Sequence, residues 1–144
     1  MQFVVLDNSL EDEWTAFVDA TPGACLGHDI AWRKVINSAL GHRPVYTMAL
    51  EDGAVKGVCP LFEARHSVLG KRLISVPVLD RAGVLACDER TYLHFAGMFR
   101  ETLQSDGHKF VQLRCLARGS EGGGEKVILT LDISDGADAL WKGF

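Results

Sequence analysis

Two long apolar runs joined by a short turn constrain the fold of this chain more than any other feature. They lie in "AVKGVCPLFEARHSVLGKRLISVP", residues 54–77, and meet at Leu69-Gly70-Lys71. Another turn precedes them at Asp52-Gly53, a dipeptide that tolerates positive φ at both central positions of a tight hairpin. The pattern predicts three consecutive antiparallel strands. Pro60 cannot donate a ladder hydrogen bond, so we expect a bulge or an unpaired position there.

Helical patterns precede these strands. After a short β-branched run at residues 3–6, Asn8-Ser9 followed by Glu11 is typical of a capping box, and "TPG" at residues 21–23 ends the helix. A second helix, with apolar residues at positions 32, 35, 36, 39 and 40, is opened by Asp29 and closed by Gly41.

A third helix is predicted after the strands, from about Asp88 to Gln104. Its buried face is expected to hold Tyr92, Ala96, Phe99 and Leu103. The strand in "KFVQLRCL" follows, and a helix between two strands suggests a parallel crossover. A glycine-rich loop, a strand in "KVILTLDI" and a terminal helical segment complete the chain.

The order of elements resembles the N-acetyltransferase (GNAT-like) fold. It implies an α+β domain with a mixed, mostly antiparallel sheet and helices on both faces, opened between its middle strands. The 144 residues fit one such domain, 1–144, with no repeat.

Composition argues against several classes of function. A net charge of −4 does not provide the basic face of a general nucleic-acid-binding protein. No run approaches the roughly 20 apolar residues of a membrane span, and the N-terminus lacks the pattern of a signal peptide. A cytoplasmic location is the default expectation.

The four cysteines are spaced 34, 28 and 28 residues apart, without the close pairs that zinc sites use, so no metal site is predicted. We expect reduced, buried thiols that pack as small hydrophobic side chains. No cofactor is predicted either. Coenzyme A would need free backbone N–H groups at a helix start, whereas "VLDRAGVLACDERTY" offers Gly83 alone and places Asp88-Glu89 at the helix entry.

Residues 28–83, "VQLR" and the late "LDISDGADALWKGF" resemble the first half of Fem-type (FemAB-like, GNAT-related) proteins, particularly those found beside exopolysaccharide gene clusters. Fem-type enzymes have two tandem GNAT-like halves and transfer an aminoacyl group from aminoacyl-tRNA to a peptidoglycan precursor. The resemblance implies the N-terminal half of an acyl or aminoacyl transferase for cell-envelope or exopolysaccharide precursors, not expected to be active alone. Its partners would be the donor and that precursor.

Three residues are candidates for catalysis. His28 precedes a helix and can act as a general base, or it can cap and pack. Asp80 lies where the resemblance places the cleft-facing loop, and its carboxylate can bind an amine, pair with Arg81 or form an Asx-turn. Arg114 is a charge within an apolar strand, so it must pair with a carboxylate, reach solvent or bind an anion. Trp32, Arg81 and Gly83 are the predicted substrate-binding residues.

Two other functions remain open. The chain can be a non-catalytic binding or scaffolding module that keeps a GNAT-like fold, or a coenzyme A-dependent N-acetyltransferase. Finally, Ala137, Leu140, Trp141 and Phe144 have helical spacing, and their apolar side predicts a homo-oligomer formed through the C-terminal segment.

Overall fold

The computed structural model describes residues 1–66, 70–105 and 107–114. Cys115, the predicted strand in "KVILTLDI" and the segment predicted to mediate oligomerisation lie outside them. The elements are β1 (Gln2–Val5), η1 (Asn8–Leu10), α1 (Glu11–Ala20), η2 (Leu26–His28), α2 (Trp32–Leu40), β2 (Arg43–Pro44), β3 (Thr47–Glu51), β4 (Ala54–Cys59), β5 (Leu61–His66), β6 (Gly70–Ser75), β7 (Leu85–Ala86), α3 (Glu89–Ser105) and β8 (His108–Gln112).

The strands form two four-stranded sheets, in the orders β1-β3-β4-β7 and β2-β5-β6-β8. The sheets are joined because β4 and β5 follow each other across Pro60 but belong to different sheets. The predicted irregularity at Pro60 is therefore a complete change of sheet. The strand pairs are antiparallel except for β6 and β8, which run parallel as the crossover predicted. The α+β class and mixed sheet are thus confirmed.

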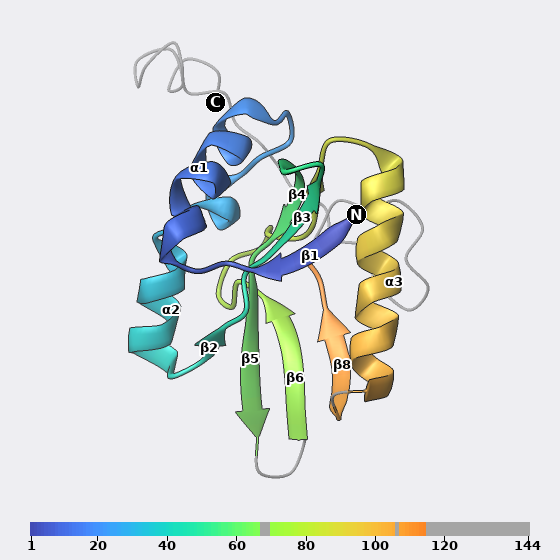
Figure 1. Cartoon of the computed structure of the whole chain (residues 1–144). Coiled ribbons are helices and arrows are strands. Elements are labelled where there is room, and N and C mark those ends of the chain that lie inside the picture. Colours follow the sequence, from blue (N-terminus) through green and yellow to red (C-terminus); the bar gives the residue numbers. More distant parts are fainter. Residues whose placement is uncertain (67–69, 106, 115–144) are drawn as a thin grey trace, which may run out of the picture.

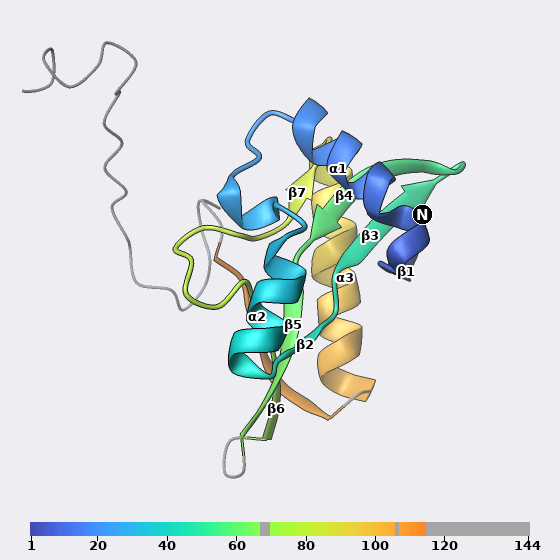
Figure 2. The same ribbon diagram turned by 90° about the vertical axis from the view of Figure 1, so that its left-hand side faces the viewer.

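Helices cover both faces of the sheets. Figure 2 shows the strands passing between α2 on one side and α3 on the other, and Figure 1 shows α1 above α2 on the side away from α3. One core cluster packs Trp14, Ile36 and Phe62 together on the α1–α2 side. The other lies between the strands and α3 and includes Leu73 of β6 and Phe95 of α3.

Local signals set several boundaries. Gly41 ends α2 in the left-handed conformation, at φ 66°, and its N–H donates to Asn37. Asp52 and Gly53 both have positive φ in the β3–β4 turn, as predicted. The predicted capping box at Asn8-Ser9 is wrong. Asp7 caps the turn η1 instead, because its carboxylate accepts from the Ser9 N–H at 2.8 Å.

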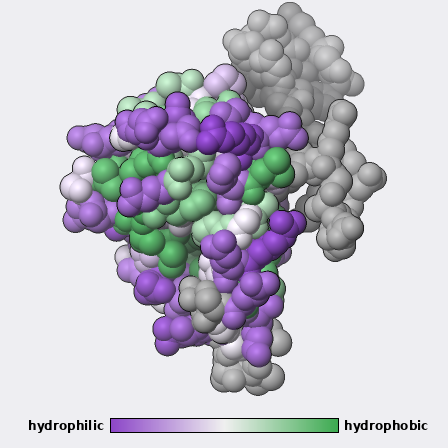
Figure 3. All heavy atoms as spheres, turned by 45° about the vertical axis from the view of Figure 1, so that its right-hand side comes forward, coloured by the Kyte–Doolittle hydropathy of each residue, from purple (hydrophilic) through white to green (hydrophobic). Residues whose placement is uncertain are grey.

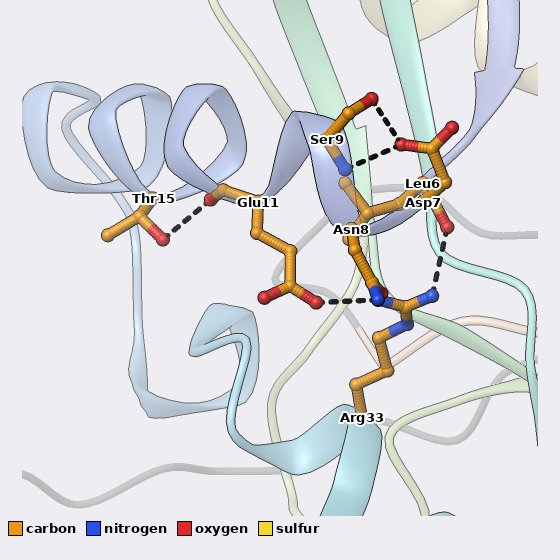
Figure 4. Close-up of polar contacts among 7 residues, drawn as sticks. All are labelled: Leu6, Asp7, Asn8, Ser9, Glu11, Thr15 and Arg33. Atoms are coloured by element: carbon orange, nitrogen blue, oxygen red, sulfur yellow. Dashed lines mark hydrogen bonds and ion pairs between the residues drawn. The ribbon is translucent and has the colours of Figure 1, made fainter.

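An arginine ties the first two helices together. Arg33 of α2 donates from Nη1 to the Glu11 carboxylate at 2.7 Å and to the Asn8 side chain at 3.3 Å, and from Nη2 to the Leu6 carbonyl at 3.2 Å (Figure 4). These contacts fix the start of α1 relative to α2.

The predicted buried face of α3 is only partly right. Phe99 is buried as predicted, but Tyr92 and Ala96 are half-buried and Leu103 is 38% exposed, and Thr91 and Phe95 are the other buried residues. The reason is the close approach of α3 to β4. A Cβ at Gly57 would lie 2.9 Å from both Thr91 and Phe95, so the helix presents these residues to a glycine in the sheet.

Large hydrophobic side chains also reach the surface, among them Val5, Leu26, Val78 and Leu93, each more than half exposed. Figure 3 shows one face of the molecule, on which hydrophobic residues form a patch with hydrophilic residues above and below it.

A buried carboxylate of the second sheet is the centre of an ion-pair network. Glu63 of β5 is 4% exposed and accepts from Arg43 at 2.9 Å, from Arg65 at 3.0 Å and from His108 at 3.2 Å. Burial by itself raises the pKa of Glu63. The hydrogen bonds and charge of Arg43, with the bonds from Arg65 and His108, outweigh burial and lower the pKa from 4.5 to about 2.

This network predicts a pH-dependent contribution to stability. Since the pKa of Glu63 is lower in the folded chain than in the unfolded chain, the stabilisation is fully present above pH 4.5. It is lost as the pH falls toward about 2. Replacing Glu63 by glutamine should lower the free energy of unfolding by about 1–3 kcal/mol near neutral pH. The difference between the two proteins should shrink near pH 2.

Urea unfolding of both proteins at several pH values measures this dependence. Glu51→Gln is the matched control, because the Glu51–Arg90 pair at 2.8 Å is partly solvated and should be worth less than about 1 kcal/mol. An effect of Glu63→Gln that stays constant across the acid range would contradict the assignment.

Candidate functional site

The site is built where the turn η2 packs against the loop before β7. Gly27 makes this contact possible, since a Cβ there would lie 2.2 Å from the Arg81 carbonyl oxygen and 2.4 Å from the Ala82 Cβ. Its neighbour His28 is buried, at 3% exposure. The two segments are more than 50 residues apart in the chain, and glycine lets them touch.

The hydrogen bonds of His28 fix its tautomer. The Cys25 backbone N–H donates to Nδ1 at 3.1 Å, so Nδ1 is an acceptor. Nε2 lies 3.2 Å from the Gly83 carbonyl oxygen, so Nε2 carries the proton and donates it. The basic nitrogen of the ring is therefore Nδ1, on the side of Cys25.

Burial lowers the pKa of His28 below its ordinary value of 6.5, and the positive charge of Arg81 lowers it further. The contacts with Gly83 and Cys25 oppose this shift without reversing it. The imidazole is consequently neutral near neutral pH, with its proton on Nε2 and the lone pair of Nδ1 accepting from the Cys25 backbone N–H.

Two open cavities adjoin His28. The α3-side cavity, of about 340 Å³, lies between Pro22-Gly23, the segment 81–86 and the start of α3 at Asp88. The α1-side cavity, of about 470 Å³, lies between α1 and the segment 21–30. Both have Gly23 and His28 in their walls. The loop that carries His28 thus separates two spaces, each of which can receive a small molecule.

The predicted site residues divide between the wall of the α3-side cavity and other positions. His28, Arg81 and Gly83 line this cavity. Arg81 also donates to the Gly23 carbonyl at 3.4 Å, and this bond links two walls of the α3-side cavity. Trp32 lines neither of the two cavities, and its Nε1 donates to the Leu26 carbonyl at 3.0 Å.

Asp80 and Arg114 also lie outside both cavities. Asp80 is exposed. The Arg114 guanidinium donates to the Leu79 carbonyl, while its backbone bonds to Ser75 and Ala82. Arg114 therefore holds the loop of residues 76–82 in place. This role differs from the predicted ones, which were pairing with a carboxylate, reaching solvent or binding an anion. The catalytic roles of Asp80 and Arg114 stay predictions.

A carboxylate occupies the start of α3. Asp88 accepts the Thr91 backbone N–H at 2.7 Å, and this bond is the main reason that the pKa of Asp88 is lowered. The aspartate thus already fills the positive end of the helix, with Glu89 beside it. A pyrophosphate needs those N–H groups and would be repelled by both charges, so this helix start does not fit coenzyme A.

Cys25 is the site residue that sequence reasoning missed. It was expected to be a buried hydrophobic side chain, but it is only partly buried and its Sγ lies 3.3 Å from His28 Nδ1. Cys59 is buried as predicted, whereas Cys87 is exposed. The available signal was the Cys-x-x-His spacing, which in the turn η2 brings the thiol and the ring together.

No three histidine, cysteine, aspartate or glutamate side chains among the described residues lie together as a metal ion would require. Nor does that part of the chain contain a helix with the length and hydrophobicity to cross a membrane.

Comparisons with known proteins bear on the fold. No family model matches the chain, and no curated protein matches its sequence. Among solved structures, the chain is similar to a GNAT family acetyltransferase from Staphylococcus aureus subsp. aureus USA300_TCH1516. The TM-score is 0.52 and the identity 11%, over 88% of this chain and 98% of that chain. At this identity the likeness shows the fold alone, and the GNAT-like fold is confirmed. The Fem-type part of the resemblance stays a prediction.

Proposed function

We propose that this chain is an acyl or aminoacyl transferase of the Fem-like kind, acting on a cell-envelope or exopolysaccharide precursor. The observation that carries the proposal is the position of His28, a neutral histidine between two cavities in a GNAT-like fold. A transferase has to bring an activated ester and an amine together, and two adjoining spaces with a base between them suit that task.

The residues around His28 suggest their roles. Its Nδ1 would accept the proton released during acyl transfer, and the Gly83 carbonyl would hold the ring in the reactive tautomer. Arg81, in the wall of the α3-side cavity, would stabilise negative charge on a substrate bound in that cavity. Asp80 and Arg114 are kept as candidates, with Arg114 acting through the loop it holds.

The acidic start of α3 favours a donor without a pyrophosphate at that position, such as an aminoacyl ester. It argues against the alternative of a coenzyme A-dependent N-acetyltransferase, which the fold alone would accommodate. A non-catalytic binding module is favoured by a different observation, since both ring nitrogens of His28 already have partners within the chain.

Thermal shift measurements should separate these functions. A ligand at 100 times its dissociation constant stabilises the folded chain by about 2.7 kcal/mol. We expect no stabilisation by acetyl-coenzyme A and a clear one by a small acyl ester. In Asp88→Asn/Glu89→Gln, which keeps a capping side chain, affinity for acetyl-coenzyme A should rise. The control Asp12→Asn/Glu13→Gln removes the same charge from α1.

Transfer from that ester to an amine then tests catalysis. In an active form, His28→Asn should lower the rate by about 10²-fold or more, the usual contribution of a general base. Alanine at Asp80 or Arg114 tests the remaining candidates. Stabilisation of the wild type by acetyl-coenzyme A would favour the acetyltransferase, and binding of an ester without transfer would favour the binding module.

A further inference from the structure

The thiol of Cys25 lies in the wall of the α1-side cavity, beside the basic nitrogen of His28. Its Sγ is 3.3 Å from Nδ1 and also 3.3 Å from the Arg81 carbonyl oxygen. The thiol has one proton and two acceptors within reach. Of these two, only the imidazole nitrogen can remove that proton, so the pair is a nucleophile with an adjacent base.

A third group orients the base. The Gly83 carbonyl accepts from Nε2 at 3.2 Å, which keeps the proton on Nε2 and the lone pair of Nδ1 on the side of Cys25, where Nδ1 also accepts the Cys25 backbone N–H at 3.1 Å. Nucleophile, base and orienting group within hydrogen-bond reach form the arrangement by which cysteine and serine nucleophiles are activated. Two segments supply the groups, residues 25–28 and the loop with Gly83, and the packing of Gly27 against the segment 81–82 holds them together.

The cavity in front of the thiol suits an acyl group. Its volume is about 470 Å³, and Val18, Leu26 and Ile30 give it apolar walls. Asp19 and Asp29 also line it and would favour a substrate that carries an amine. An aminoacyl ester fits both kinds of wall, because it can have an apolar side chain and an amino group. A short acyl ester fits the apolar walls alone.

We propose that Cys25 is a catalytic nucleophile that takes the acyl group of an activated ester or thioester before it passes to the acceptor. This inference rests on the proposed transferase function. Sγ attacks the carbonyl carbon while its proton moves to His28 Nδ1. The carbonyl then re-forms as the bond to the alcohol or thiol breaks, and His28 returns the proton to that leaving group. The products are S-acyl-cysteine and the free alcohol or thiol.

The second step restores the enzyme. The acceptor amine attacks the thioester carbonyl, the carbon–sulfur bond breaks, and the amine proton passes through His28 to the Cys25 sulfur. Overall, an ester and an amine become an amide and an alcohol, or a thioester gives an amide and a thiol. No oxidant or reductant is needed.

Cys87 provides a matched control within the same chain. It is exposed, and its Sγ lies 3.4 Å from the Asp88 carboxylate and 3.9 Å from the Thr91 hydroxyl oxygen. Exposure alone would make Cys87 the faster thiol. Activation by His28 predicts the opposite order, because the imidazole can take the proton of Cys25 as its sulfur attacks, whereas Cys87 has a carboxylate beside it.

The experiment treats the full chain with S-acetyl-N-acetylcysteamine, a small thioester without phosphate, in a Cys115→Ser background. Peptide mapping by mass spectrometry follows acetylation of each remaining cysteine with time. Cys25 should be acetylated at least ~10-fold faster than Cys87, and His28→Asn should remove that advantage. The comparison of Cys25 with Cys87 is made in the protein that keeps His28. It therefore tests the inference even if the His28→Asn protein does not fold.

Faster labelling of Cys87, or labelling of Cys25 only in urea, would overturn the inference. A second arm separates it from the proposed function. If Cys25→Ser still transfers acyl groups to an amine at the wild-type rate, transfer is direct, so this inference fails while the proposed function stands. If Cys25 is acetylated rapidly but no amine receives the group, the nucleophile stands and the transferase proposal fails.

Discussion

Replacing Gly27 by alanine should destabilise the chain by about 3 kcal/mol or more. The new Cβ would meet the Arg81 carbonyl oxygen at 2.2 Å and the Ala82 Cβ at 2.4 Å, and neither atom is the end of a flexible side chain. Overpacking of this kind usually costs about 1–3 kcal/mol, and more when the backbone has to move. The shift would also separate His28 from Gly83, so any activity should fall with stability.

Gly97→Ala is the matched control. Gly97 lies within α3, and a Cβ there would have no heavy atom within 4 Å. Because alanine is the better helix former, this substitution should stabilise by about 0.5–1 kcal/mol. Chemical unfolding at equilibrium measures both. A Gly27→Ala protein as stable as the wild type would mean that η2 and the segment 81–82 are not in contact.

Trp14→Ala should have an effect of similar size, about 3–5 kcal/mol, because it empties the largest buried position of the α1–α2 core. Trp14 is fully buried, its ring centre lies 4.9 Å from that of Tyr46, and its Nε1 donates to the His28 carbonyl at 2.8 Å. The substitution therefore removes packing and also releases the turn that carries His28.

Trp14→Phe separates the two contributions. It keeps most of the packing but leaves the buried His28 carbonyl without this donor, which should cost about 1–3 kcal/mol. Unfolding in urea should show a lower midpoint at an unchanged slope for both variants. A loss below about 1 kcal/mol for Trp14→Ala would contradict the packing described for α1.

Much of the fold follows from local sequence signals. Three of these signals act through the backbone of the residues themselves: Gly41 at a helix end, Asp52-Gly53 in a hairpin turn and Pro60 at the change of sheet. Their effects can therefore be predicted without knowledge of tertiary contacts. The buried face of α3 is different. The periodicity of 92, 96, 99 and 103 is as good as that of 91, 95 and 99, and only the partner glycine at position 57 decides between them.

The candidate site depends on contacts that sequence spacing does not encode. His28 and Gly83 are 55 positions apart, and their contact arises because η2 packs on the loop before β7. Three of the predicted site residues, His28, Arg81 and Gly83, line the α3-side cavity, and their roles stay predictions. The sequence did not indicate Cys25, because a thiol among apolar neighbours resembles a core residue, and its contact with the histidine three positions later appears only in the folded chain.

The most direct test of the central claim is a map of where a donor binds. The full chain, labelled with ¹⁵N, would be titrated with an unreactive ketone analogue of S-acetyl-N-acetylcysteamine and followed by amide chemical shifts. We predict that the changes gather on both sides of the His28 loop, at Gly23, Cys25, His28 and Gly83. Changes confined to the distant β5–β6 hairpin, or none at saturating analogue, would contradict the assignment of this site.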